Sequence, residues 1–444
     1  MMKFAEPTLG HRDEARPVLF RGARIVDPAA GSDQTGDLLV VSGKIVETAA
    51  EIAPPEGTEI VTCNGAVLAP GLVDMQVHAG EPGHEHLETL ASASRAAAAG
   101  GVTTMACMPC TDPPIDDPAL VDFVLRRARD TAIVNVVPIA AATRGLKGAE
   151  MTEIGMLQEA GAVAVSGGRG AIANSGLMRR LLTYAGDFGV LVINAVEDAE
   201  LAGSGVMNES EAATRLGLAG IPVAAETVML DRDLRLAALT GGRYHAGQIS
   251  AAESVEALRA ARKRGVKVTC GVSIAHLTLN QYDIGSYRTF LKMHPPLRTE
   301  DDRLALVEAL ADGTIDVVIS NHDPQDVDTK RQPFAEASDG AIGLETMLAA
   351  SLRLYHDGSV TLPALMAAMS TRPAKLLGLS CGTLAPGSPA DLVLFDPGAP
   401  WIVEAAALSS KSKNTPFEDA RMQGRVLRTV VAGRAVYEYS SSGN

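Results

Sequence analysis

Positive charge and long apolar runs are both scarce in this sequence of 444 residues. It has 39 Lys and Arg against 53 Asp and Glu, which gives a formal net charge of −14. Nucleic acids and anionic membranes bind proteins through basic surfaces, so we expect neither as a partner. No stretch reaches the roughly 18 apolar residues of a membrane span, and the N-terminus lacks the apolar segment of a signal peptide. These absences predict a cytoplasmic protein whose partners are small molecules or other proteins.

Cysteine is also scarce, and its pattern does not suggest a disulfide framework. The five cysteines are scattered and odd in number, and only Cys107 and Cys110 are spaced as a CxxC pair. A zinc or redox site is one interpretation of that pair. Cys107 falls within an apolar strand pattern, however, and no second CxxC accompanies it. We therefore interpret the pair as reduced thiols of a buried strand.

Apolar residues are plentiful, at 46% of the chain, which is enough for a large core. From residue 71 onward, apolar strands alternate with helical stretches rich in Ala and Leu. The expected strands are 72–77, 102–107, 132–138, 162–165, 190–194, 243–248, 267–271 and 315–320. The expected helices are 87–99, 118–130, 151–160, 175–188, 224–239, 252–264, 301–311, 343–357, 362–370 and 373–378. Eight β-then-α units predict an α/β fold, a (β/α)₈ TIM barrel over residues 69–384.

Two segments rich in short alternating strands flank the barrel, at 17–68 and 385–444. We expect the two to combine into one composite β-sandwich domain beside the barrel. Residues 1–16 are polar, and we predict a flexible N-terminal segment there.

Five motifs follow one another along the chain and carry a family resemblance. They are GLVDMQVHAGEPG (71–83), MPCTDPP (108–114), KMHPPLR (292–298), PFAEASDGAIGLETML (333–348) and SKSKNTPF (410–417). Together they resemble the dihydroorotase family of the cyclic amidohydrolase superfamily, in collinear order from about residue 17 to 438. The resemblance implies an amidohydrolase-type barrel with a composite β-sandwich domain. It also implies zinc-dependent hydrolysis of a cyclic amide C–N bond in pyrimidine biosynthesis.

The same resemblance implies where the metal ligands of such a hydrolase stand. The family uses His-x-His after strand one, Asp or carbamylated Lys after strand four, His after strands five and six, and Asp after strand eight. The matching residues here are Gln76 and His78, Gly167, Ala195, Gln248 and Asn321. Zinc prefers neutral imidazoles and carboxylates, so only His78 remains a good ligand. An amide such as Asn321 cannot act as a general base either. We therefore expect no zinc and no intact catalytic residue.

The substrate positions that the resemblance implies are changed as well. The arginine that clamps a substrate carboxylate in the family corresponds to Gly80. Cys110 and His294 replace two asparagines, and His276 alone matches a pocket residue of the family. We treat His276, His294 and Cys110 as the remnants of a substrate pocket, with His294 more consistent with a packing replacement than with a new catalytic group.

Two other places could hold a positive charge. His84 and His86 lie near Glu81 in the loop after strand one, where we favour an exposed polar loop over a metal site. Arg169 stands next to the position of the bridging ligand. It either fills the vacated cation site and pairs with a carboxylate such as Glu81, or it is a solvated loop arginine, which we favour.

Two functions from different classes remain open. The first is a pseudoenzyme, because some bacteria have an inactive dihydroorotase homologue that assembles with the catalytic chain of aspartate carbamoyltransferase. The second is an active cyclic amidohydrolase with a remodelled metal site, built from His78, His276 or His322, and Asp323. Whether the chain is an enzyme is thus uncertain, and the sequence favours the pseudoenzyme, which we expect to form a homo-oligomer as its family often does.

Overall fold

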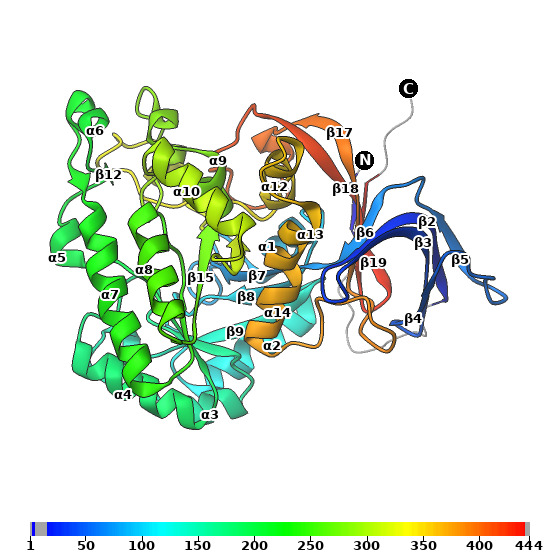
Figure 1. Ribbon diagram of the computed structural model, residues 1–444, viewed down its shortest axis with the longest axis horizontal. Helices are drawn as coiled ribbons and strands as arrows, with labels where there is room; N and C mark the ends of the chain where they lie inside the picture. Colours follow the sequence, from blue (N-terminus) through cyan, green and yellow to red (C-terminus); the bar gives the residue numbers. More distant parts are fainter. Residues whose placement is uncertain (1, 5–15, 440–444) are drawn as a thin grey trace.

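The computed structural model describes residues 2–4 and 16–439, and its larger part is a barrel of eight parallel strands (Figure 1). Neighbouring strands pair in the order β16-β15-β14-β11-β10-β9-β8-β7. A parallel bridge between Val77 and His322 then connects the first strand to the segment after the last. The strands are β7 (Leu72–Val77), β8 (Val102–Cys107), β9 (Asn135–Ala141), β10 (Ala164–Ser166), β11 (Leu191–Asn194), β14 (Tyr244–Ala246), β15 (Val268–Ser273) and β16 (Val317–Ile319). The predicted barrel is therefore confirmed.

A helix follows each barrel strand and covers its outer face. These helices are α1 (Leu90–Ala99), α2 (Pro118–Thr131), α3 (Ile154–Glu159), α4 (Ser175–Asp187), α7 (Val223–Thr240), α8 (Ala252–Lys263), α10 (Glu300–Ala311) and α12 (Met347–His356). Local sequence fixes several of their starts. Thr89 and Thr299 form capping boxes, and Asp117 caps α2 in front of a proline at its first position. The helix α13 (Leu362–Met366), the π-turn η4 (Ala367–Thr371) and α14 (Arg372–Leu377) complete the barrel.

Short elements fill the connections, and most were not predicted. The link between β11 and α7 contains α5 (Ala199–Ala202), β12 (Met207–Asn208), α6 (Glu211–Leu216) and β13 (Gly220–Ile221), with β12 and β13 paired in parallel. The remaining turns are η1 (Arg144–Leu146), α9 (Ile274–Thr278), η2 (Gln281–Ile284), η3 (Thr289–Leu291), α11 (Val327–Lys330) and η5 (Ala405–Ala407).

Strands from both ends of the chain form one nine-stranded sheet beside the barrel (Figure 1). Its order is β1-β19-β18-β17-β6-β2-β3-β4, with β5 paired to β2. The strands are β1 (Met2–Phe4), β2 (Val18–Asp27), β3 (Ser32–Val41), β4 (Lys44–Ala49), β5 (Glu59–Thr62), β6 (Val67–Pro70), β17 (Leu392–Ile402), β18 (Arg421–Val431) and β19 (Arg434–Tyr439). The expectation of a composite domain from both termini is confirmed.

Part of the N-terminal segment predicted to be flexible belongs to this sheet. Residues 2–4 form β1, which pairs antiparallel with β19, whereas residues 5–15 lie outside the described residues. The ladder hydrogen bonds to β19 are the physical reason that this stretch is a strand, and the apolar alternation used to predict strands is too short to reveal it.

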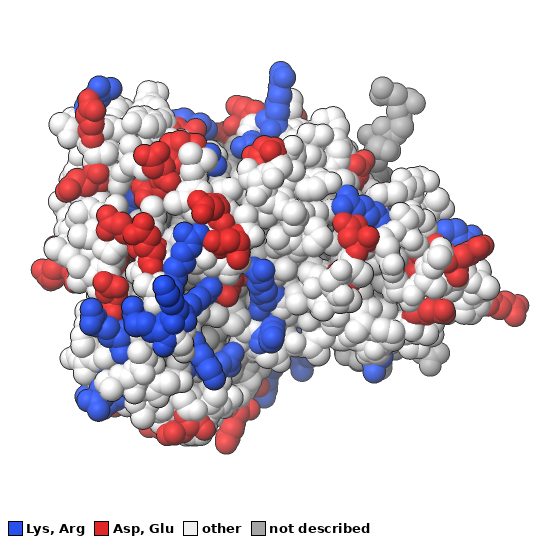
Figure 2. All heavy atoms as spheres, in the orientation of Figure 1, with Lys and Arg blue, Asp and Glu red and all other residues white. Residues whose placement is uncertain are grey.

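Charge on the surface is mixed in sign. Figure 2 shows Lys and Arg gathered below α8 and α10 on the face in view, with Asp and Glu spread around them. Arg259 and Arg262 of α8 pair with Asp312 and Asp316, each at 2.5 Å, so part of this positive charge is neutralised. None of the described helices has the length and apolar character needed to cross a membrane.

Candidate functional site

A small cavity, here called the rim cavity, lies where the barrel strands end. Its volume is about 50 Å³, well below the roughly 300 Å³ at which ligand pockets usually begin. Eight of the residues singled out from the sequence line it: Gln76, His78, Arg169, Ala195, Gln248, His294, Asn321 and Asp323. The structure therefore brings most of the expected positions together, in a space that holds little more than water.

An ion pair crosses one side of this cavity and joins two loops far apart in sequence. Both terminal nitrogens of Arg169, in the loop after β10, donate to the two carboxylate oxygens of Asp323, in the loop after β16. The Asp323 side chain is 8% exposed and that of Arg169 is 43% exposed, so the guanidinium reaches inward from the surface. Burial opposes the charged form of Asp323, but the neighbouring His78 and Arg169 outweigh it and lower the pKa of that carboxyl. The chain thus provides its own cation beside the rim positions that the resemblance assigns to metal ligands.

This pairing corrects the favoured expectation of a solvated loop arginine: Arg169 is partly exposed but pairs with a carboxylate, which is Asp323 and not Glu81. Glu81 is buried and accepts hydrogen bonds from Arg127 Nε at 2.5 Å and from the backbone N–H of Leu90 at 3.0 Å. It therefore anchors the start of α1. The rings of His84 and His86 are 6.1 Å apart, and His86 is exposed, as expected for a polar loop.

His78 is the one imidazole of the family's ligand set that remains, and its surroundings do not complete a metal site. Burial, followed by the charge of Arg169, lowers the pKa of His78 to about 4, so the ring is neutral near pH 7. The carboxylate of Asp323 is already bound by Arg169. The other positions matched to the family's ligands are the amides Gln76, Gln248 and Asn321 and two residues without a donor side chain, Gly167 and Ala195, and these suit zinc poorly. Glu197 and His294 also line the cavity. Among residues 16–439, no group of three or more His, Cys, Asp or Glu side chains is arranged to hold a metal ion.

His322 was considered from the sequence as a ligand in a remodelled metal site, but its side chain belongs to a different cluster. Its Nδ1 accepts a hydrogen bond from the N–H of Gly343 at 3.3 Å, and its Nε2 is 3.5 Å from a carboxylate oxygen of Glu88. It is fully buried and does not line the rim cavity. His78, His322 and Asp323 therefore do not converge on one point.

Gln248, which lines the rim cavity, is buried and lies within hydrogen-bond distance of the buried ring of His276. His276 Nε2 lies 3.1 Å and 3.2 Å from the carbonyl oxygens of Pro295 and Pro296, so this nitrogen carries the proton. Nδ1 then accepts from Ser273 Oγ at 2.7 Å and from Gln248 Nε2 at 3.1 Å. Burial lowers the pKa of His276 to about 4. Gln248 Oε1 is buried with no hydrogen-bond partner among the described residues.

His294 and Asn321 close the outer side of the cavity. His294 Nε2 is 3.6 Å from Glu197, a carboxyl whose pKa is raised by burial, and its Nδ1 is 4.0 Å from Asp339. Asn321 has a φ of 51°, a left-handed conformation that asparagine tolerates better than most residues. Its Nδ2 donates to the carbonyl of His294 at 3.5 Å.

Three of the positions that we expected in the site do not line the cavity: His276, Gly167 and Cys110. A Cβ atom at Gly167 would lie 3.0 Å from Asn194 Oδ1 and from the carbonyl oxygen of Gly170, so the loop leaves little room for a side chain at this position. Cys110 lies next to the same loop, where a Cβ at Gly168 would be 3.1 Å from its Sγ. Burial raises the pKa of Cys110 to about 11, which keeps the thiol protonated.

Sequence reasoning missed a buried carboxylate at the centre of the motif loops. Glu88 is fully buried and accepts hydrogen bonds from Ser92 Oγ, from Ser410 Oγ and from the N–H of Lys411 at 3.1 Å, with His322 nearby. We call these five residues the Glu88 cluster. The only sequence feature that pointed to Glu88 was the SKSKNTPF motif, which contains its hydrogen-bond partner Ser410, 322 residues away.

The GLET and SKNTPF motifs connect the same loops. Glu345 accepts from the N–H groups of Ser409 and Ser410, at 2.6 and 3.1 Å. Asn414 donates to the carbonyls of Asp323 and Gly340, at 3.3 and 3.1 Å. These motif residues therefore position backbone and do not line the rim cavity.

Comparisons with known proteins give consistent results. A family model described as dihydro-orotase-like matches residues 65–254, and a model of the amidohydrolase family matches residues 338–437. A dihydroorotase from Geobacter metallireducens is 45% identical over 421 residues, covering 95% of this chain and 99% of that protein. A dihydroorotase from Syntrophus aciditrophicus is 42% identical over 422 residues, with the same coverage.

Solved structures agree on the architecture. An L-hydantoinase (dihydropyrimidinase) from Arthrobacter aurescens superposes with a TM-score of 0.86 at 26% identity, covering 94% of this chain and 95% of that one. A dihydropyrimidinase from Brevibacillus agri gives 0.82 at 21% identity and 95% coverage of both chains, a likeness that shows the fold alone.

Proposed function

The chain belongs to the dihydroorotase family of the cyclic amidohydrolase superfamily, and from that premise we propose that it is a non-catalytic member of the family. In this proposal it is a pseudoenzyme of pyrimidine biosynthesis that binds no zinc. Its role is to support another protein through the surface of its fold.

One observation carries the proposal: the guanidinium of Arg169 is bound to Asp323 beside the positions where the family holds its metal. A metal ion lowers the pKa of bound water from about 15.7 to about 7. Losing that shift costs on the order of 12 kcal/mol of water activation. Asn321, an amide, offers no base that compensates. The amides at the matched ligand positions do not fit zinc, so in this proposal no metal ion activates water.

For the partner we propose the catalytic chain of aspartate carbamoyltransferase, in the cytoplasm, with this chain as a homo-oligomeric structural component of the complex. The support is the family resemblance together with the intact motif loops, whose polar groups are bonded within the fold and not aimed at a substrate. Co-expression of the two chains, followed by affinity purification and size-exclusion chromatography, tests this. Separate elution of the two chains would contradict it.

The decisive experiment is metal analysis of the chain purified without added zinc, together with an assay of dihydroorotate hydrolysis. We expect zinc far below one equivalent per chain and no turnover above the rate without protein. One equivalent of zinc together with turnover would overturn the proposal.

A second candidate is an active amidohydrolase with a remodelled site, which the names of relatives at 45% identity favour. It predicts a measurable activity on dihydroorotate or another cyclic amide that His78→Ala abolishes. The geometry supports it less, because Asp323 is already occupied by Arg169 and His322 belongs to the Glu88 cluster.

A further inference from the structure

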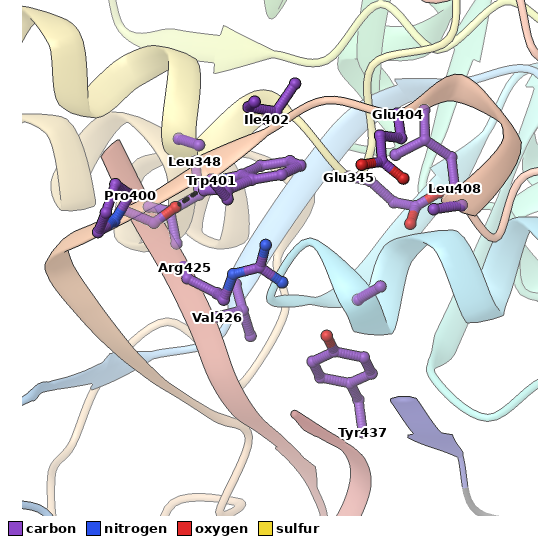
Figure 3. A pocket seen from close by; sticks show the side chains of 14 residues that line it. Glu345, Leu348, Pro400, Trp401, Ile402, Glu404, Leu408, Arg425, Val426 and Tyr437 are labelled. Atoms are coloured by element: carbon purple, nitrogen blue, oxygen red, sulfur yellow. Dashed lines mark hydrogen bonds between the residues drawn. The ribbon is translucent and has the colours of Figure 1, made fainter. Parts of the chain in front are cut away.

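A second, larger cavity lies between the barrel and the nine-stranded sheet, away from the rim. Its volume is about 370 Å³, within the range of small-molecule sites. The barrel contributes the end of α1 and the start of α12, and the sheet contributes β17, β18 and β19. Figure 3 shows this space with Trp401 and Arg425 on the sheet side and two carboxyl side chains opposite. No residue discussed for the rim cavity lines it.

Arg425 supplies a positive charge in this cavity, opposite the carboxyl side chains of Glu345 and Glu404. Its guanidinium lies over the rings of Trp401 and Tyr439, at 5.0 Å and 4.2 Å from their centroids. Within the described residues, which end at 439, it forms no ion pair. Most other arginines near carboxylates in this chain are paired, including Arg428 on the same strand with Glu438. Stacking holds the guanidinium in place while its N–H groups remain available to a planar anion.

The walls suit a flat ring. The indole N–H of Trp401 donates to the carbonyl of Gly424 at 2.8 Å, which fixes the orientation of the ring. Leu348, Leu408 and Val426 add apolar surface. Burial raises the pKa of Glu345 to about 7, so this carboxyl repels an anion less than an ordinary glutamate does near neutral pH.

We propose that this interdomain cavity binds a small planar anion, namely an aromatic or heteroaromatic ring that carries a carboxylate. The carboxylate pairs with Arg425 through two N–H bonds, and the ring packs against Trp401. Such a ligand touches both the barrel and the sheet, so its binding stabilises their contact. This inference goes beyond the proposed function and does not depend on it, because the two cavities share no residue.

The chain offers a selective reporter, since Trp401 is its only tryptophan. Titration of the full-length protein with benzoate, followed by tryptophan fluorescence, should give a saturable change. Benzamide has the same ring without the charge, and we expect it to bind at least about tenfold more weakly. Equal binding of the two probes, or no saturable change with benzoate, would overturn the proposal.

Three variants locate the site. Arg425→Gln should reduce benzoate affinity to the level of benzamide, and Arg421→Gln, an exposed arginine on the same strand, is the matched control that should leave it unchanged. Ala407→Phe fills the cavity from an exposed position and should remove binding without touching Arg425. Thermal unfolding verifies that each variant is folded. Unchanged benzoate affinity in a folded Arg425→Gln or Ala407→Phe variant would contradict the assignment.

Discussion

Two neighbouring residues, His322 and Asp323, belong to two clusters that differ in how deeply their charged groups are buried. His322 joins the Glu88 cluster, where each carboxylate oxygen of Glu88 receives several donors within the protein. Asp323 faces the rim cavity, where Gln248 Oε1 has no partner among the described residues and a single arginine balances the charge. The same loop therefore contacts two kinds of surroundings. On one side is a fully buried carboxylate with three donors, beside His322 Nε2, which has no hydrogen-bond partner among the described residues. On the other side is an ion pair whose arginine is 43% exposed.

The difference between the two clusters suggests why a chain of this kind retains some motifs of its family and not others. Motif residues that bond loops to one another carry the free energy of folding, so their loss destabilises the protein whatever the chemistry of the site. Residues whose only task was to bind metal can change freely once catalysis is not required. The contrast can be tested by asking how much stability each cluster contributes.

The largest effect is expected at Glu88. Glu88→Ala leaves two hydroxyls and a backbone N–H without their shared acceptor inside the protein, and it removes the carboxylate 3.5 Å from His322 Nε2. We expect a loss of about 3–4 kcal/mol in the free energy of unfolding, measured by urea denaturation. Glu256→Ala, at an exposed position of α8, is the control and should change stability by less than about 0.5 kcal/mol. A cost below about 1 kcal/mol at Glu88 would break the comparison.

The next effect is expected from restoring a family ligand. Gly167→Asp places a Cβ 3.0 Å from two oxygens and adds a carboxylate in a closed loop, and should cost about 2–3 kcal/mol. Gly170, in the same loop, has no atom within 4 Å of an added Cβ, so Gly170→Asp is the matched control with little expected change. If Gly167→Asp leaves the free energy of unfolding unchanged and increases zinc affinity, the loop has room for a carboxylate and the site is more intact than we propose.

A smaller effect is expected from Arg169→Met, which leaves Asp323 buried without its cation. Because Arg169 is partly exposed, we expect about 1–2 kcal/mol at pH 7. The double variant with Asp323→Asn should recover most of that loss. Arg126→Met removes only a surface pair within α2 and should have almost no effect.

The effect of Arg169→Met should also depend on pH. The pKa of Asp323 is lowered in the folded protein, so its contribution to stability is complete above the usual carboxyl pKa and is lost as pH falls through the lower folded value. The stability difference between wild type and Arg169→Met should therefore shrink below about pH 4. A difference that stays constant from pH 7 to pH 3 would show that the ion pair is not its source.

The smallest effect is expected at Gln248. Gln248→Met removes an unbonded buried oxygen at similar volume, while His276 keeps the hydroxyl of Ser273 as a partner. We expect a change within about 1 kcal/mol, in either direction. Asn414→Leu removes a buried amide that is bonded at both ends and should cost about 2 kcal/mol or more. Similar costs for the two amides would remove the distinction between the clusters.

Much of the fold could be predicted from the sequence, because apolar periodicity reports burial directly. Strands β7 and β8 begin and end where predicted, and α4 and α8 differ by one residue. Strand β9 lies three residues later than expected, since the apolar run there continues on both sides of the true start. The elements between β11 and α7 are short and partly exposed, so they leave no periodic signal.

The candidate site was predictable only in part, for a different physical reason. Strand ends meet at one rim in a barrel, so the positions that line the cavity follow from the order of the strands. The partner of Arg169 does not follow from the strand order. Asp323 is 154 residues away, and any of several carboxylates could have paired with the guanidinium. Such contacts between loops depend on where the side chains lie in space, and the pattern of apolar and polar residues along the sequence gives no information about that.

The pairing of Arg169 with Asp323 has a consequence for the evolutionary history open to this chain. A return to metal dependence requires Arg169 to leave, Gly167 to gain a carboxylate in a crowded loop, and several imidazoles to appear. Each step taken alone unpairs a buried charge or crowds the loop before any metal can bind. Under the proposed function, the Arg169–Asp323 pair therefore stabilises the rim in its present form and opposes the return of a metal ion.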